Sequence, residues 1–153
     1  MDKQKVLAIV GPTGIGKTSL SVWLAKQLNG EIISCDSMQV YKKMDIGTAK
    51  VTQEEMQGVH HELIDVQNYD EPYNVKVFQE KCRKAIEDVV KRGKFPVLCG
   101  GTGLYLKAAL YDYEFQEEQE DAAYTAYLNS KTNEKLVEML EEQDVKALEK
   151  IHP

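Results

Sequence analysis

Arginine is almost absent from this chain of 153 residues, which contains only Arg83 and Arg92. Both lie in one stretch of helical spacing, away from the glycine-rich segments of the chain. Arginine makes the strongest planar contacts with phosphate groups. A site for phosphate in these residues would therefore depend on lysine and a metal ion, or on arginines that lie outside them.

Cysteine and long apolar runs are also scarce. The three cysteines, Cys35, Cys82 and Cys99, have no paired spacing, which argues against a disulfide framework or a zinc site. Cys35 and Cys99 lie beside apolar runs and are expected to be small core residues. No apolar run is long enough to cross a membrane, and the first residues lack a signal-peptide pattern. We therefore expect a cytosolic protein with no membrane contact.

The formal net charge of −6 is unevenly distributed. Residues 1–110 have a net charge of +2, whereas residues 111–153 have a net charge of −8. Charge acts through individual faces of a protein rather than through the average of the chain. The first part could therefore contact RNA, and the acidic last part is a poor place for phosphate contacts.

An apolar run at 6–10 leads into a segment that matches the phosphate-binding pattern G-x-x-x-x-G-K-[ST]. Its residues are Gly11, Pro12, Thr13, Gly14, Ile15, Gly16, Lys17 and Thr18. Amides at the start of a helix attract anions, and glycines let the main chain approach them closely. Lys17 would neutralise phosphate oxygens, and the Thr18 hydroxyl would bind a magnesium ion. The pattern predicts a polyphosphate site and leaves the ligand open.

Two further segments follow predicted strands. Asp36 comes directly after the second strand, where it could act as a general base or a magnesium-shell acceptor, or could simply shape a turn. Gly100-Gly101-Thr102-Gly103 could admit a ligand to the main chain, or could be a turn that needs positive φ angles. Asp65 could organise magnesium, and a structural role for His60-His61 is favoured over metal binding.

Hydrophobic periodicity predicts alternating strands and helices up to residue 113. The expected strands cover 5–10, 31–34, 61–66 and 95–99. The expected helices cover 17–28, 51–57, 75–92 with Asn74 as its cap, 104–110, 121–130, 133–142 and 144–151. The first helix has an apolar stripe of Leu20, Trp23, Leu24 and Leu28. We expect an α/β fold with a P-loop NTPase-like parallel sheet at 1–113, and an acidic helical segment, the start of an insertion domain, at 114–153.

Taken together, the motifs resemble the tRNA dimethylallyltransferases, also called tRNA isopentenyltransferases. The resemblance covers residues 5 to about 113. The matching segments, in the order of the family, are 11–18, Asp36-Ser37-Met38-Gln39-Val40-Tyr41, Asp45-Ile46-Gly47-Thr48-Ala49-Lys50, Leu63-Ile64-Asp65 and 96–105. Generic P-loop proteins share only the first of these segments.

The resemblance implies magnesium-dependent transfer of a dimethylallyl group from dimethylallyl diphosphate to the exocyclic amine of the adenosine 3′-adjacent to the anticodon of tRNA. It implies that residues 11–18 hold the diphosphate and that Thr18 binds Mg²⁺. Asp36, Lys17 and Thr102 would be the catalytic residues, with Asp36 as the base. The residues implied to contact the tRNA anticodon stem-loop are Asp36, Ser37, Met38, Gln39 and Thr102.

Some departures from the family pattern affect these expectations. Gly14-Ile15 replaces the usual Ala-Ser, so the loop lacks one hydroxyl. Family members continue from a similar His-Pro into an arginine-rich helix that returns to the core. We therefore expect a monomeric fragment of a longer enzyme, with an incomplete core, that binds diphosphate but transfers poorly by itself.

Three alternatives stay open. A small-molecule or nucleotide kinase shares the loop, the sheet and the magnesium ion. An isopentenyltransferase that acts on free adenine nucleotides shares the motifs as well. A non-catalytic P-loop regulator would need no base. Asp36 and the 100–103 segment favour prenyl transfer over the kinase, which has no common reason to combine them.

Overall fold

The computed structural model describes residues 4–115 and 121–148. The chain divides into two compact units, Met1–Phe115 and Gln116–Pro153. The first unit contains a β-sheet with helices, and the described part of the second unit contains helices alone.

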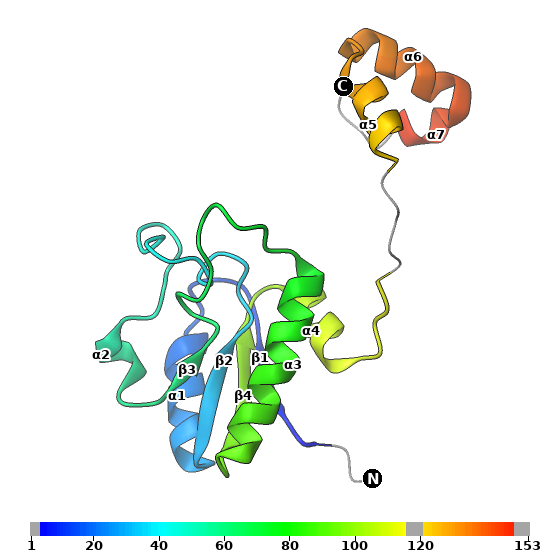
Figure 1. Ribbon diagram of the computed structural model, residues 1–153. Helices are drawn as coiled ribbons and strands as arrows, with labels where there is room; N and C mark the ends of the chain where they lie inside the picture. The colour runs from blue at the N-terminus through cyan, green and yellow to red at the C-terminus, as the bar shows by residue number, and fades with distance from the viewer. Residues whose placement is uncertain (1–3, 116–120, 149–153) are drawn as a thin grey trace. The chain divides into compact units, whose positions relative to one another are not determined.

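Four parallel strands form the sheet of the first unit (Figure 1). They are β1 (Leu7–Val10), β2 (Gly30–Ser34), β3 (His61–Glu62) and β4 (Phe95–Gly100). The order in the sheet is β1-β4-β2-β3, so β4 lies between β1 and β2. The expected parallel α/β arrangement is confirmed, and the carboxyl ends of β1, β2 and β4 meet at one edge.

Helices cover both faces of this sheet (Figure 1). Helix α1 (Lys17–Gln27) packs on one face, and α3 (Val75–Lys91) packs on the other. Helix α4 (Gly103–Leu110) follows β4 and contacts α3, and the short α2 (Gln53–Met56) precedes β3. The crossover helices are what allow neighbouring strands to run in the same direction.

Alternating side chains of the two central strands fill two separate cores. Ile32 and Val97 belong to the core under α1, whereas Ile33 and Leu98 belong to the core under α3. All four are fully buried. Burying such an aliphatic side chain contributes about 1.5–3 kcal/mol relative to leaving it exposed. The sheet is therefore fixed from both faces, and its loops at the carboxyl edge start from rigid positions.

Helix α3 forms as its sequence pattern predicts. The Asn74 side chain accepts a hydrogen bond from the Val77 amide at 3.0 Å, which caps the first turn. Phe78, Cys82 and Val89 have no exposed surface and form the stripe that faces the sheet. Cap and stripe agree with the prediction within one residue at the C-terminal end.

Helix α1 differs from the expectation. The residues that it buries are Ser21, Val22 and Ala25, while Leu20 and Trp23 are 48% and 59% exposed. Of the expected stripe, Leu24 packs against the core, whereas Leu20, Trp23 and Leu28 are exposed. The face of α1 that contacts β2 and β4 carries Ser21, Val22 and Ala25 instead.

The strand expected at 61–66 is much shorter in the structure. β3 contains only His61 and Glu62. Leu63 and Asp65 have positive φ angles of 64° and 56°, which are incompatible with an extended strand. The apolar run predicted a strand, but main-chain pairing with residues 39–42 bends this segment instead.

The second unit contains three described helices, α5 (Ala122–Asn129), α6 (Asn133–Gln143) and α7 (Val145–Leu148). The Asp121 side chain caps α5, and the Thr132 side chain caps α6. Neither α5 nor α6 contains a fully buried residue. Residues 149–151 of the last expected helix lie outside the described residues.

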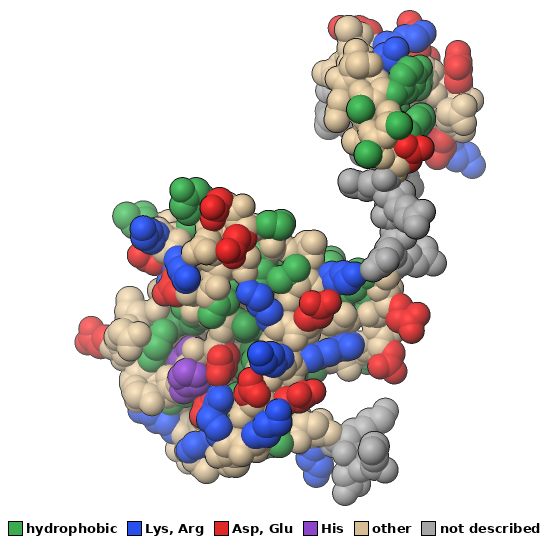
Figure 2. Space-filling view, in the orientation of Figure 1, with side chains coloured by type: hydrophobic (Ala, Val, Ile, Leu, Met, Phe, Trp, Pro, Cys, Tyr) green, Lys and Arg blue, Asp and Glu red, His purple; other side chains and the backbone are tan. Residues whose placement is uncertain are grey.

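No described helix has both the length and the apolar composition needed to span a membrane. On the face of the first unit shown in Figure 2, lysine, arginine and acidic side chains are intermixed over α3. The small positive charge of residues 1–110 is therefore not gathered into one patch on this face.

Candidate functional site

The phosphate-binding loop joins β1 to α1. Gly14 and Gly16 have φ angles of 85° and 90°, in the left-handed region that favours glycine. Helix α1 begins directly afterwards, at Lys17. The loop thus presents the start of an 11-residue helix to solvent, which is the arrangement that binds anions through main-chain amides.

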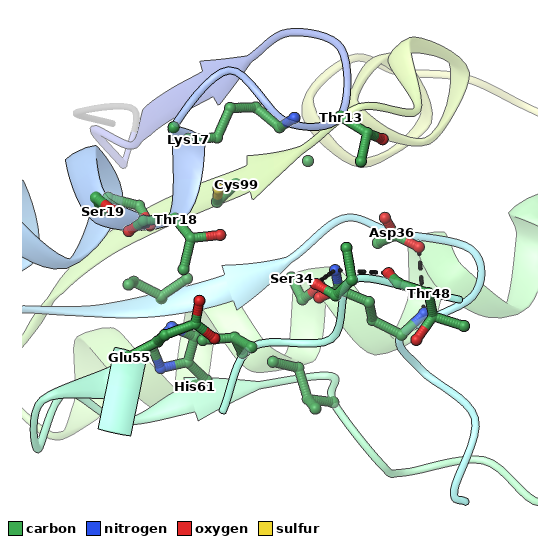
Figure 3. Close-up of a pocket in the computed structure, with 18 of the residues that line it drawn as sticks. Thr13, Lys17, Thr18, Ser19, Ser34, Asp36, Thr48, Glu55, His61 and Cys99 are labelled. Atoms are coloured by element: carbon green, nitrogen blue, oxygen red, sulfur yellow. Dashed lines mark hydrogen bonds between the residues drawn. The ribbon is translucent and has the colours of Figure 1, made fainter. Parts of the chain in front are cut away.

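Lys17 lies along its own loop. Its ammonium group donates to the Pro12 carbonyl at 2.5 Å, and it points back over the loop toward Thr13 (Figure 3). A Cβ at Gly11 would lie 2.5 Å from the end of the Ile15 side chain and 3.8 Å from the Lys17 side chain, so Ile15 is the residue that would have to move. An arriving phosphate can exchange places with the Pro12 carbonyl as the partner of the ammonium group.

A cavity of about 260 Å³ lies between this loop and the segments that follow β2 and β3. One side, called the loop wall, consists of Thr13, Gly14, Gly16, Lys17 and Thr18. The side called the opposite wall consists of Asp36, Gln39, Thr48 and Ala49. Figure 3 shows the two walls facing each other across the open space. The structure thus brings the loop and Asp36 to one cavity, as their positions at the carboxyl ends of strands in one parallel sheet predict.

Asp36 has two roles in this geometry. Its Oδ1 accepts hydrogen bonds from the amides of Met38 at 2.8 Å and Gln39 at 3.2 Å, which shapes the turn after β2. Its Oδ2 accepts no hydrogen bond from the described residues. The carboxylate therefore serves as a turn residue through one oxygen and keeps the other available at the cavity.

The Gln39 side chain joins the two segments that form the opposite wall. Its side-chain amide donates to the carbonyls of Thr48 at 3.3 Å and Ala49 at 2.9 Å. The sequence reasoning assigned no site role to Thr48 or Ala49, although both belong to a matching motif. Their presence in the wall depends on a loop that folds back from residue 44, a tertiary feature that spacing does not reveal.

Other predicted site residues lie outside the cavity lining. Ser37 is half-buried and Met38 is 44% exposed, and neither lines the cavity. Thr102 precedes α4, where its carbonyl accepts hydrogen bonds from the amides of Tyr105 and Leu106. Gly11, Pro12 and Ile15 belong to the loop but do not line the cavity. Roles of Ser37, Met38 and Thr102 toward tRNA stay predictions.

The glycines at 100–103 serve a purpose that the sequence did not indicate. None of them has a positive φ, so the turn interpretation is wrong. A Cβ on Gly100 would lie 2.4 Å from the Cys35 carbonyl, and one on Gly101 would lie 3.2 Å from the Gly11 carbonyl. These glycines let three main-chain segments pack closely at the carboxyl edge of the sheet, and one of the contacts is with Cys35, the residue before Asp36.

Asp65 does not face the phosphate loop. It forms an ion pair with Lys50 at 2.5 Å and lies outside the cavity lining. Its suggested role in organising magnesium is therefore not supported by the structure. The positive φ of Asp65 turns its side chain toward the 41–50 segment instead.

The two arginines and two adjacent histidines have structural partners. Arg92 donates to Glu31 at 2.5 Å and to Glu62 at 2.8 Å, and these hydrogen bonds raise its pKa. Glu31, His60 and Glu62 lie close enough together to suggest a metal site, but the guanidinium already satisfies both carboxylates. The His60 ring lies 3.1 Å from Glu62. The structural interpretation of His60 therefore fits better than metal binding.

His61 and Arg83 both have main-chain carbonyl partners. The Nδ1 of His61 lies 2.9 Å from the Val59 carbonyl, and burial lowers the pKa of its imidazole. His61 also borders the cavity. Arg83 donates to the carbonyls of Ala108, Ala109 and Tyr111 at the end of α4. Both arginines of the chain are thus bound elsewhere, and neither lines the cavity.

Comparisons with known proteins converge on one family. The sequence model of IPP transferase matches residues 39–153. A tRNA dimethylallyltransferase of Bacillus anthracis is 49% identical over 99% of this chain and 50% of its own length. The chain spans about half the length of the curated relatives it matches.

Solved structures agree with the sequence matches. The full-length tRNA isopentenylpyrophosphate transferase of Bacillus halodurans has a TM-score of 0.74 and 48% identity, over 99% of this chain and 51% of that one. A eukaryotic dimethylallyltransferase described as acting on tRNA has a TM-score of 0.77 and 35% identity, over 99% of this chain and 38% of that one. Each of these matches covers 99% of this chain.

Proposed function

The chain belongs to the IPP transferase family, and we propose that its cavity is the donor and acceptor site for prenyl transfer to tRNA. The donor is dimethylallyl diphosphate. The acceptor is the exocyclic amine of the adenosine 3′-adjacent to the anticodon, and diphosphate is the leaving group. The observation that carries the proposal is the cavity itself, with a phosphate-binding loop on one wall and a carboxylate on the other.

The loop wall supplies the chemistry that the leaving group needs. As the bond from the allylic carbon to oxygen breaks, negative charge grows on the diphosphate and the carbon becomes cation-like. Main-chain amides at the start of α1 and the ammonium group of Lys17 stabilise that charge. The phosphate loop thus serves an alkyl transfer and takes no part in phosphoryl transfer.

The opposite wall supplies the base. An adenine amine is a weak nucleophile because its lone pair is delocalised into the ring. Asp36 accepts the amine proton through Oδ2 while the new bond to carbon forms, and Oδ1 keeps its hydrogen bonds to the turn. The adenine must leave its stack in the RNA to reach this position.

Magnesium fits the loop wall through one protein group. The Thr18 hydroxyl lines the cavity beside Lys17, and the remaining ligands would be diphosphate oxygens and water. A bound Mg²⁺ would neutralise charge on the departing diphosphate. Asp65 does not contribute, because Lys50 already pairs with it.

The remaining features of the proposal concern the whole protein. The relatives named above act on tRNA, which supports a tRNA anticodon stem-loop as partner and a cytosolic location. We further infer a monomer, and an insertion-domain role for the acidic helices of the second unit. Sedimentation velocity of the chain would test the monomer directly.

The test uses radiolabelled dimethylallyl diphosphate, Mg²⁺ and an anticodon stem-loop hairpin, with labelled ATP in a parallel reaction. The Bacillus halodurans enzyme serves as positive control. We expect this chain to bind the labelled prenyl donor and to transfer little label by itself, and the Bacillus halodurans enzyme to release diphosphate only together with label transfer to RNA. ATP hydrolysis without binding of dimethylallyl diphosphate would reject prenyl transfer in favour of a P-loop kinase.

A further inference from the structure

The ammonium group of Lys50 lies behind the opposite wall and outside the cavity lining. Its side chain is only 6% exposed. It donates to the Tyr41 carbonyl at 2.8 Å, to Asp45 at 2.7 Å and to Asp65 at 2.5 Å. A lysine ammonium has three donors, so all of them are in use.

These three contacts join stretches of chain that are separate in sequence. Tyr41 follows the turn that Asp36 shapes, Asp45 lies in the loop that folds back, and Asp65 follows β3. Main-chain hydrogen bonds run along the same boundary, from the Asp65 amide to the Gln39 carbonyl and from the Val66 amide to the Val40 carbonyl. Lys50 therefore links the three segments that border the opposite wall.

The main chain of the segments that Lys50 links is strained. Ala49, Leu63 and Asp65 have φ angles of 48°, 64° and 56°, in the left-handed region that side chains other than glycine rarely adopt. Such conformations persist only where surrounding contacts enforce them. Lys50 is next to Ala49 in sequence and is bonded to Asp65, so it contacts the strained segments directly.

The electrostatics favour a permanent ion pair. Burial lowers the pKa of Lys50, but hydrogen bonds from the ammonium to Asp45 and Asp65 outweigh this effect and raise the pKa. The ammonium therefore stays charged at neutral pH. Only the lysine is shielded from water, since the side chains of Asp45 and Asp65 are 68% and 51% exposed. Removing the ammonium would therefore leave two exposed carboxylates without the group that joins them.

We propose that Lys50 is the positioning residue of the opposite wall, and that it holds Asp36 and Gln39 in place for the acceptor. It acts through the wall, because it is not among the residues that line the cavity. The proposal rests on the proposed function in one respect, namely that this wall faces adenosine. The phosphate loop is built on β1 and α1, so diphosphate binding does not depend on Lys50.

The experiment compares the wild-type chain with Lys50→Met, which keeps the length of the side chain and removes its charge. Lys42→Met is the matched control, because Lys42 lies on the same segment and is exposed. Among the described residues its ammonium group bonds only to Asn68. Amide hydrogen exchange is measured at residues 65–67. Isothermal titration gives the affinity for inorganic diphosphate with Mg²⁺, and then for an anticodon stem-loop hairpin.

We expect amides 65–67 to exchange about tenfold faster or more in Lys50→Met, and the hairpin to bind about tenfold more weakly. Diphosphate affinity and exchange in β4 should stay within about twofold of wild type. Lys42→Met should match wild type throughout. A purely structural role predicts instead that diphosphate affinity falls together with hairpin affinity.

Two results would overturn the role of Lys50: unchanged exchange at 65–67 in Lys50→Met, or an equal loss of affinity for diphosphate and hairpin. A wild-type chain that binds no diphosphate would instead overturn the proposed function. In that case the exchange comparison would still decide whether Lys50 holds the wall, so the two failures are distinguishable.

Discussion

At the scale of single residues, Asp36 combines a structural and a chemical task in one carboxylate. Oδ1 is bound to the amides of Met38 and Gln39, and Oδ2 faces no donor among the described residues. An asparagine can keep the first task because its amide oxygen accepts the same hydrogen bonds. It loses the second task, because an amide cannot take a proton at neutral pH.

We predict that Asp36→Asn, made in the full-length enzyme, lowers the rate of prenyl transfer by about 10²–10⁴-fold, which is the usual contribution of a positioned general base. Stability should change by no more than about 0.5 kcal/mol, since the turn is retained. Single-turnover transfer of label and urea unfolding measure the two quantities. Transfer at the wild-type rate would show that Asp36 is not the base.

The lowered pKa of His61 predicts that the free energy of unfolding depends on pH. Burial lowers the pKa of its imidazole in the folded chain, so the unfolded chain binds more protons at mildly acidic pH. Its contribution is fully present above the unfolded pKa of about 6.5 and is lost as the pH falls through the folded value. Urea midpoints at pH 7.5 and 5.5 should therefore differ less in His61→Gln than in wild type. The same difference in both proteins would count against this assignment.

Single-residue features divide into local ones, which the sequence predicts, and tertiary ones, which it does not. The phosphate loop is local, because Gly14, Gly16 and Lys17 act within a few residues of one another. Gly100 and Lys50 act on partners far away in sequence, the Cys35 carbonyl and Asp65. Their roles depend on the order of strands in the sheet, which no short pattern contains.

At the scale of secondary structure, the cap of α3 offers a clean measurement. Asn74→Ala removes the acceptor of the Val77 amide and should lower the free energy of unfolding by about 1 kcal/mol. Lys84→Ala, an exposed change on the same helix, should alter it by less than about 0.5 kcal/mol. Equal effects of the two substitutions in urea unfolding would argue against a stabilising cap.

Helices with both a cap and a stripe were predicted best. Asn74 and the Phe78, Cys82 and Val89 stripe located α3 to within a residue or so. The run at 61–66 had apolar residues but no cap or turn signal to show where the strand ends. Main-chain pairing with 39–42 ended it after Glu62. Periodicity identified the apolar stripe of α1 but could not show which face the sheet contacts.

At the scale of the whole molecule, every residue that lines the cavity belongs to the first unit, between Thr13 and Gly100. We therefore predict that a chain of residues 1–115 binds inorganic diphosphate with Mg²⁺ within about twofold of the affinity of the full chain. Isothermal titration of both chains at one ionic strength makes the comparison. A loss of more than tenfold would mean that the second unit takes part in diphosphate binding.

The exposed face of α1 has a practical consequence, since Trp23 is the single tryptophan of the chain and is 59% exposed. Its indole fluorescence arises from one place, in contact with water and outside the cavity lining. Emission from this protein therefore reports on whatever covers the outer face of α1. A partner segment that packs there would shift the spectrum to the blue and shield it from iodide, with no label added to the protein.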